Sequence, residues 1–154
     1  MANTYTQIHI QTVFTVRNRA CLIKPDWKLR LYKYITSTIN NRGHKVLSIN
    51  GMPDHIHVFF GMRPTQSLAD LMKEVKRDSS YFINVNRLTS VRFEWQEGYG
   101  AFSYARSQVN SVMRYIKNQE IHHERYHFLE EYEYFLKQFE VDYKKEYLFK
   151  SVDY

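Results

Sequence analysis

The sequence contains little of what a secreted or membrane-bound protein needs. Its single cysteine, Cys21, excludes an intrachain disulfide and is typical of a reducing compartment. The first residues lack the basic start and apolar run of a signal peptide, and no stretch is long enough to span a bilayer. These absences predict a cytoplasmic protein with no membrane partner.

Glycine and proline are also scarce, at 5 and 3 residues among 154. No linker, repeat or low-complexity segment divides the chain. Hydrophobic residues make up 44% and charged residues 25%, as in ordinary globular proteins. We therefore predict one domain over residues 1–154, with a helical tail from about residue 126.

Basic residues outnumber acidic ones by 22 to 16, which gives a formal net charge of +6. This excess favours a polyanionic partner. The chain also carries 13 Tyr, 10 Phe and 2 Trp. Rings mixed with lysine and arginine suit single-stranded nucleic acid, whose bases stack on aromatic side chains. Many of these rings must serve as core, so composition alone does not identify the partner.

Hydrophobic periodicity predicts an α+β fold. Strands are expected over 4–16, 45–50, 55–61 and 93–95, and helices over 25–43, from Ser67 to beyond Phe82, from a Ser107 cap, and in the tail. The order strand, helix, hairpin, helix, strand is that of a ferredoxin-like antiparallel sheet. Such a sheet is expected to carry its helices on one face and to leave the other face for a site.

The run from Asp54 to Phe60 holds two histidines, His55 and His57, that a β-strand places on one face. Neutral imidazole is the commonest metal ligand, although two histidines cannot complete a structural zinc site. Asp54 can orient one imidazole, or it can simply belong to the turn. Two hydrogen-bonded histidines on a half-exposed strand would explain the pair equally well.

A third ligand is offered by Gln119, which follows Tyr115 by four residues on the edge of a predicted helix. Nitrogen and oxygen ligands together suit Mg²⁺ or Mn²⁺, with positions left for water and a phosphate oxygen, although imidazole also accepts Zn²⁺ or Ni²⁺. The Tyr115 phenol, with an ordinary pKa of about 10, needs such an ion to attack a phosphate at neutral pH. An edge tyrosine packed on a neighbour is the structural alternative.

Two other tyrosines have the same spacing to a glutamine. Tyr104 precedes the expected Ser107 cap, so its helical pairing with Gln108 should fail. Tyr134 lies next to the acidic run 130–133, a poor neighbourhood for a DNA phosphate. Tyr115 is therefore the preferred nucleophile.

Together these residues resemble the single-tyrosine HUH transposases of the insertion sequence 200/605 family, in which HUH denotes His, a hydrophobic residue and His. The similar segments are residues 11–14, 54–57, 67–73, 79–80, 98–103, 115–120 and 122–123. Residues 15–17 depart from the pattern of many relatives, which leaves the role of that stretch open.

The resemblance implies that His55, His57 and Gln119 bind the divalent ion and that Tyr115 is the nucleophile. The expected reaction is cleavage and rejoining of single-stranded DNA through a 5′-phosphotyrosine. The resemblance also implies a homodimer with merged sheets, in which the tyrosine helix of one subunit completes the metal site of the other.

The DNA is expected to carry hairpin ends. Candidates for holding it, each of which can equally be a solvated basic residue, are Lys73, Lys76, Arg77, Arg87 and Arg92. Two other functions stay open. A non-catalytic or domesticated protein would bind hairpin DNA or RNA without cutting it. A metal-dependent phosphodiesterase using water would form no protein–DNA adduct.

Overall fold

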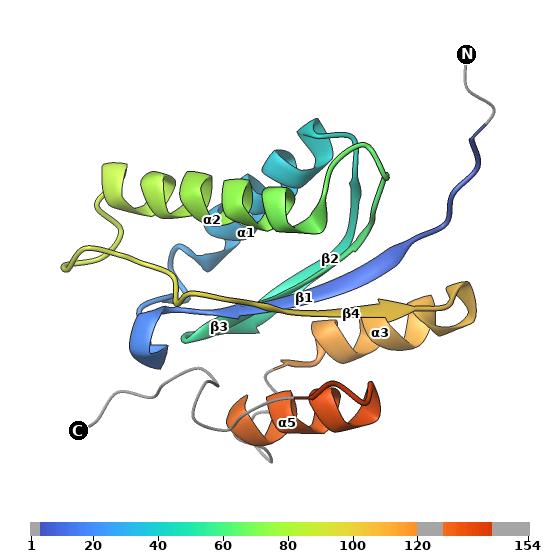
Figure 1. Ribbon diagram of the computed structural model, residues 1–154. Helices are drawn as coiled ribbons and strands as arrows, with labels where there is room; N and C mark the ends of the chain where they lie inside the picture. Colours follow the sequence, from blue (N-terminus) through green and yellow to red (C-terminus); the bar gives the residue numbers. More distant parts are fainter. Residues whose placement is uncertain (1–3, 120–127, 143–154) are drawn as a thin grey trace.

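An antiparallel sheet of four strands forms the centre of the molecule (Figure 1). This computed structural model describes residues 4–119 and 128–142. The strands lie in the order β2-β3-β1-β4. Their bounds are His9–Thr15 for β1, Lys45–Met52 for β2, His55–Gly61 for β3 and Gly100–Tyr104 for β4. The α+β class is thereby confirmed.

Helices cover both faces of this sheet in Figure 1. Helices α1 (Lys28–Asn41) and α2 (Leu68–Val85) lie on one face, while α3 (Val109–Lys117) and α5 (Phe128–Gln138) lie on the other. The prediction that helices occupy one face only is therefore wrong for this chain. None of the helices in the described ranges is both long and apolar enough to cross a membrane.

The alternation of β3 decides which side chains face which helices. Ile56, Val58 and Phe60 belong to the core cluster that α1 and α2 cover. His55 and His57 point to the opposite face, where apolar residues of α5 form a separate cluster with β1 and β4. Every residue of β3 from His55 to Phe60 is buried, so both faces of the central strands are closed.

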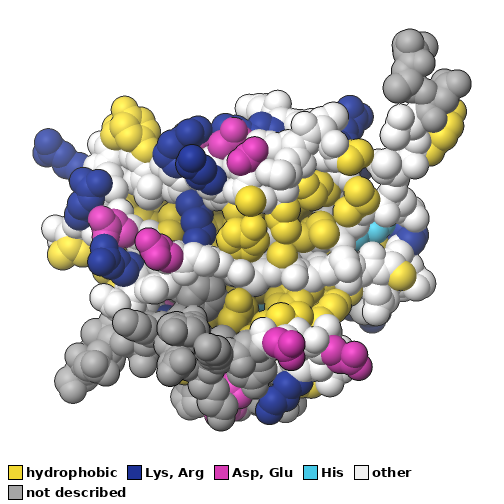
Figure 2. Space-filling view, in the orientation of Figure 1, with side chains coloured by type: hydrophobic (Ala, Val, Ile, Leu, Met, Phe, Trp, Pro, Cys, Tyr) yellow, Lys and Arg dark blue, Asp and Glu magenta, His cyan; other side chains and the backbone are white. Residues whose placement is uncertain are grey.

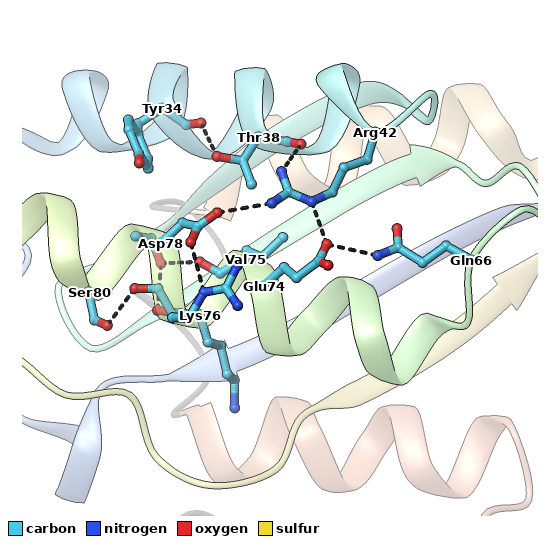
Figure 3. A network of polar contacts seen from close by, with 11 residues as sticks. Tyr34, Thr38, Arg42, Gln66, Glu74, Val75, Lys76, Asp78 and Ser80 are labelled. Carbon is cyan, nitrogen blue, oxygen red and sulfur yellow. Dashed lines mark hydrogen bonds and ion pairs between the residues drawn. The ribbon is translucent and has the colours of Figure 1, made fainter.

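Polar side chains hold α1 against α2 on the face of the sheet that these two helices cover (Figure 3). Arg42, just past the end of α1, donates to Glu74 and to Asp78 of α2, the latter over 3.0 Å. The start of α2 is fixed separately, because the Ser67 hydroxyl accepts from Asp70 N over 3.1 Å, as the sequence predicted. These contacts hold the two helices in place above the sheet.

Two predicted boundaries are wrong. Residues 93–95 contribute only an isolated bridge between Val16 and Trp95, because the backbone of Phe93 is hydrogen-bonded by the Asn84 side chain instead. The fourth strand is β4, further along the chain. Ser107 does not cap the third helix either. A 3₁₀ turn, η2 (Arg106–Gln108), precedes α3, and the Gln108 side chain accepts from Ala105 N.

Within the predicted tail the structure has one helix, α5 over Phe128–Gln138, while residues 126 and 127 lie outside the described ranges. Helix α3 ends at Lys117, so Gln119 follows its last turn. The predicted pairing of Tyr115 with Gln119 along a continuous helix is therefore replaced by a pairing across a helix end.

Candidate metal and tyrosine site

The two histidines of β3 form the centre of the site, and a neighbouring side chain fixes the Nδ1 atom of each. His55 Nδ1 donates to Asp54 Oδ1 over 2.7 Å, and His57 Nδ1 donates to Gln11 Oε1 over 2.8 Å. Since these oxygens accept hydrogen bonds, both Nδ1 atoms carry a hydrogen. In both rings Nε2 is therefore the nitrogen left to bind a metal, as in metal-binding histidines. The first hydrogen bond agrees with the expectation that Asp54 orients an imidazole.

Burial and hydrogen bonding set the charges here. Burial lowers the pKa of His55, which favours the neutral ring that a cation requires. Burial alone would raise the pKa of Asp54, but the hydrogen bond and charge of His55, together with Arg19, hold that pKa below its usual value. Asp54 is therefore an ionised acceptor behind His55.

Glu131 of α5 converges on both histidines. Its Oε1 atom lies 2.9 Å from His57 Nε2 and 3.8 Å from His55 Nε2. One ligand atom from each of the three residues lies within 4.8 Å of the others, and all three side chains are buried. Two imidazole nitrogens and a carboxylate oxygen are a ligand set that divalent metal ions accept. These three residues could therefore hold a divalent metal ion.

Tyr115 of α3 completes the cluster. Its ring centroid is 6.1 Å from that of His57, and its hydroxyl donates to Glu131 Oε2. Burial, followed by the charge and hydrogen bond of Glu131, raises the pKa of Tyr115, whereas a hydrogen bond with Gln119 opposes that rise. The phenol is therefore protonated in this arrangement.

Gln119 is fully buried and lies beside the phenol rather than on the exposed side of the molecule. The structure thus brings His55, His57, Tyr115 and Gln119 together within one chain. The resemblance instead predicted that a second subunit would contribute the tyrosine, and that exchange stays a prediction.

Sequence reasoning missed two residues of this site, Glu131 and Gln11. A detectable signal existed for Glu131, because it lies on the apolar stripe of α5 with Phe128, Tyr132 and Phe135. A carboxylate on a buried helix face usually has a specific partner. Gln11 offered the weaker signal of a polar residue that shares the inward face of β1 with Val13.

Three of the five predicted DNA-binding residues line a cavity of about 630 Å³ between α2 and residues 92–97: Lys76, Arg77 and Arg92. Arg17 joins them. Burial lowers the pKa of Lys76 to about 8. Lys73 and Arg87 are exposed elsewhere on and just after α2. In Figure 2 lysines and arginines gather over the C-terminal half of α2 and the segment after it.

A strand-borne His-hydrophobic-His pair, a carboxylate and a tyrosine on an antiparallel sheet define an HUH-type site. Residues 4–119 match the family described as "Transposase IS200 like". This match spans most of the chain, so the protein belongs to that family, which the motifs had indicated. Helix α5 and Glu131 lie beyond the matched residues.

Solved structures share the fold at low sequence identity. A candidate transposase of Deinococcus radiodurans R1 is 15% identical with a TM-score of 0.63, covering 77% of this chain and 95% of its own. A REP-associated tyrosine transposase, bound to a REP hairpin, is 14% identical with a TM-score of 0.59; the match covers 80% of this chain and 73% of that one. No curated protein matches the sequence.

Proposed function

We propose that this protein cleaves and rejoins single-stranded DNA through a covalent bond to Tyr115. The observation that carries the proposal is the convergence of His55 Nε2, His57 Nε2 and the Tyr115 hydroxyl on one carboxylate, Glu131. Family membership supports the reaction class. A protein that only bound nucleic acid would not need a half-buried phenol beside two oriented imidazoles.

His55 and His57 hold the divalent ion in this proposal, and Glu131 and Gln119 are its oxygen ligands. The ion, Mg²⁺ or Mn²⁺, would polarise a phosphate and offset its charge when bound. The chain itself positions the phenol, because the half-buried ring of Tyr115 packs against His57 of β3 and Phe135 of α5. Nothing in this arrangement requires a nucleotide cofactor.

The proposed reaction forms one phosphorus–oxygen bond and breaks another. The Tyr115 oxygen forms a bond to phosphorus while the bond from phosphorus to the 3′ oxygen breaks. The phenol loses its proton and the departing oxygen gains one, so the products are a 5′-phosphotyrosine and a free 3′-OH. A second 3′-OH reverses the exchange and rejoins the strands.

The DNA partner of the proposal is a single strand with hairpin ends, as the hairpin-bound structural relative suggests by analogy. Lys76, Arg77 and Arg92 share a cavity wall with Arg17 and are suited to phosphate contacts. Lys73 and Arg87 stay in the proposal as peripheral contacts.

The predicted homodimer and the cytoplasmic location also remain part of the proposal. Light scattering of the protein in solution tests the dimer.

An adduct assay tests the proposal. The substrate is a pool of 3′-labelled oligonucleotides in which a fixed hairpin is flanked by randomised single-stranded nucleotides, incubated with Mn²⁺. We expect a labelled protein–DNA adduct on a denaturing gel, absent with chelator and absent in Tyr115→Phe. Tyr134→Phe is the matched control, because Tyr134 has the same spacing to a glutamine but is 60% exposed.

Each other result selects a different function. An adduct that persists in Tyr115→Phe places the nucleophile elsewhere. Cleavage without any adduct identifies a water-using phosphodiesterase. Hairpin binding without cleavage, under every metal tested, identifies a non-catalytic hairpin-binding protein.

A further inference from the structure

A second cavity, of about 290 Å³, adjoins the metal and tyrosine site. Its walls come from β1, the end of β4, η2, α3 and α5, and the lining residues are Gln11, Tyr104, Gln108, Ser111, Val112, Tyr115 and Phe135. Its size is at the lower limit of ligand cavities, which span about 300–1,000 Å³. A cavity this small suits one planar group rather than a length of DNA.

Tyr115 belongs to both the site and the cavity. Its hydroxyl donates to Glu131 in the site, while its ring lines the cavity next to Phe135, with centroids 5.6 Å apart. A group bound in the cavity therefore lies beside whatever is bound at the phenol. If a phosphate reacts at Tyr115, the base of an adjacent nucleotide can reach this cavity.

Hydrogen bonds within the cavity wall determine which of its polar atoms can donate to a bound group. Because His57 donates to Gln11 Oε1, the Gln11 amide nitrogen is left to donate, and it donates to the Tyr104 hydroxyl over 2.7 Å. Tyr104 accepts that bond, so its own hydrogen is able to be donated to a bound group. Burial, opposed in part by the Gln11 hydrogen bond, raises the pKa of Tyr104 to about 12, so that hydrogen stays in place at neutral pH.

Gln108 strengthens this donor character. Its Oε1 accepts from Ala105 N over 2.8 Å, which leaves its amide nitrogen as the end that can donate to a bound group. The Ser111 hydroxyl can donate as well. The cavity thus combines aromatic rings with donors and suits a flat ring that carries acceptor atoms.

We propose that this cavity binds one nucleobase of the single-stranded DNA, next to the scissile phosphate, through stacking on its aromatic rings and hydrogen bonds from Tyr104 and Gln108. This inference rests on the proposed function, since it assigns a specificity pocket to the same reaction. A nucleobase presents carbonyl and ring-nitrogen acceptors, and stacking of a base on aromatic side chains is a common mode of single-strand recognition.

The test fills the cavity from a residue that is not itself part of the metal and tyrosine site. Ser111 is exposed on α3, so Ser111→Phe places a ring in the cavity while the core stays intact. Asn110→Phe is the matched control, because Asn110 is an exposed neighbour that does not line the cavity. Tyr104→Phe removes one donor and keeps the ring.

Two readouts are combined. The adducts formed from the randomised pool are sequenced, and the binding of an oligonucleotide from that set to Tyr115→Phe protein is measured by fluorescence anisotropy, with each nucleotide made abasic in turn. We expect a base preference at one position beside the cleavage point, and a loss of about tenfold in affinity when that position is abasic. Ser111→Phe should abolish both effects, Tyr104→Phe should reduce them, and Asn110→Phe should preserve them.

Adduct formation with no base preference, or an abasic loss that Ser111→Phe leaves unchanged, would overturn the pocket while leaving the proposed function intact. Absence of any adduct from the wild-type protein would refute the proposed function, and the pocket with it.

Discussion

Glu131 Oε1 lies 2.9 Å from His57 Nε2, although the two residues are 74 positions apart in the chain. The contact joins α5 to the central strand β3. It places a carboxylate between the metal-binding edge of the histidines and the hydroxyl of Tyr115. Helix α5 is thus a structural part of the site as well as a cover for the sheet.

Removing the charge of Glu131 should weaken metal binding. In Glu131→Gln the oxygen that faces both Nε2 atoms becomes neutral, and we expect the affinity for Mn²⁺ to fall about 10–100-fold. Competition with a fluorescent chelator measures this directly. Glu130→Gln is the control, since Glu130 is exposed on the preceding position of α5. Equal affinities of the two variants would exclude Glu131 as a ligand.

Gln11 should act on the metal through His57. Gln11→Ala removes the acceptor that fixes the His57 Nδ1 hydrogen, so the ring can rotate or change tautomer. We predict a similar loss of about 10–100-fold in Mn²⁺ affinity. Thr12→Val, which alters the next residue on the opposite face of β1, should leave affinity unchanged. If both variants lose metal equally, the effect reflects general damage to the strand.

Lys76 should make DNA binding sensitive to alkaline pH. Burial lowers the pKa of Lys76 to about 8, so its positive charge is present below that pH and lost as pH rises through it. Between about pH 7 and about pH 9, the slope of log affinity against log salt should shrink by about 0.7–0.9, the value of one phosphate contact. Lys76→Arg keeps its charge, so its slope should not change. A slope that shrinks equally in both proteins would assign the effect to another group.

Gly100 should control how α5 docks. A Cβ atom at this position would lie 2.6 Å from Tyr132 Cε2 of α5. Gly100→Ala therefore has to displace that ring, and we expect a loss of about 1–3 kcal/mol in unfolding free energy. Hydrogen exchange should rise in α5 and not in α1 or α2.

Gly61→Ala is the control for this change, because the nearest atom to its Cβ would be 3.9 Å away. Unchanged exchange in α5 of Gly100→Ala would show that the helix accommodates the methyl group without moving.

Much of the site was predictable because it depends on local periodicity. The two-residue repeat of a strand places His55 and His57 on one face whatever surrounds them. The Ser67 cap likewise depends on neighbours in sequence. The strand predicted over 93–95 did not form, because the side chain of Asn84 makes the backbone hydrogen bonds of Phe93. Local pattern cannot foresee such competition.

The family motifs of residues 4–119 were readable from the amino-acid order, and so was the pairing of imidazoles with a phenol. The tertiary structure decided what closes the site. The acidic run that includes Glu131 looked unfavourable to a phosphate on sequence grounds, yet burial of Phe128, Tyr132 and Phe135 carries Glu131 against the histidines. Packing of an apolar stripe against a distant strand fixes such a position, and no spacing along the chain encodes it.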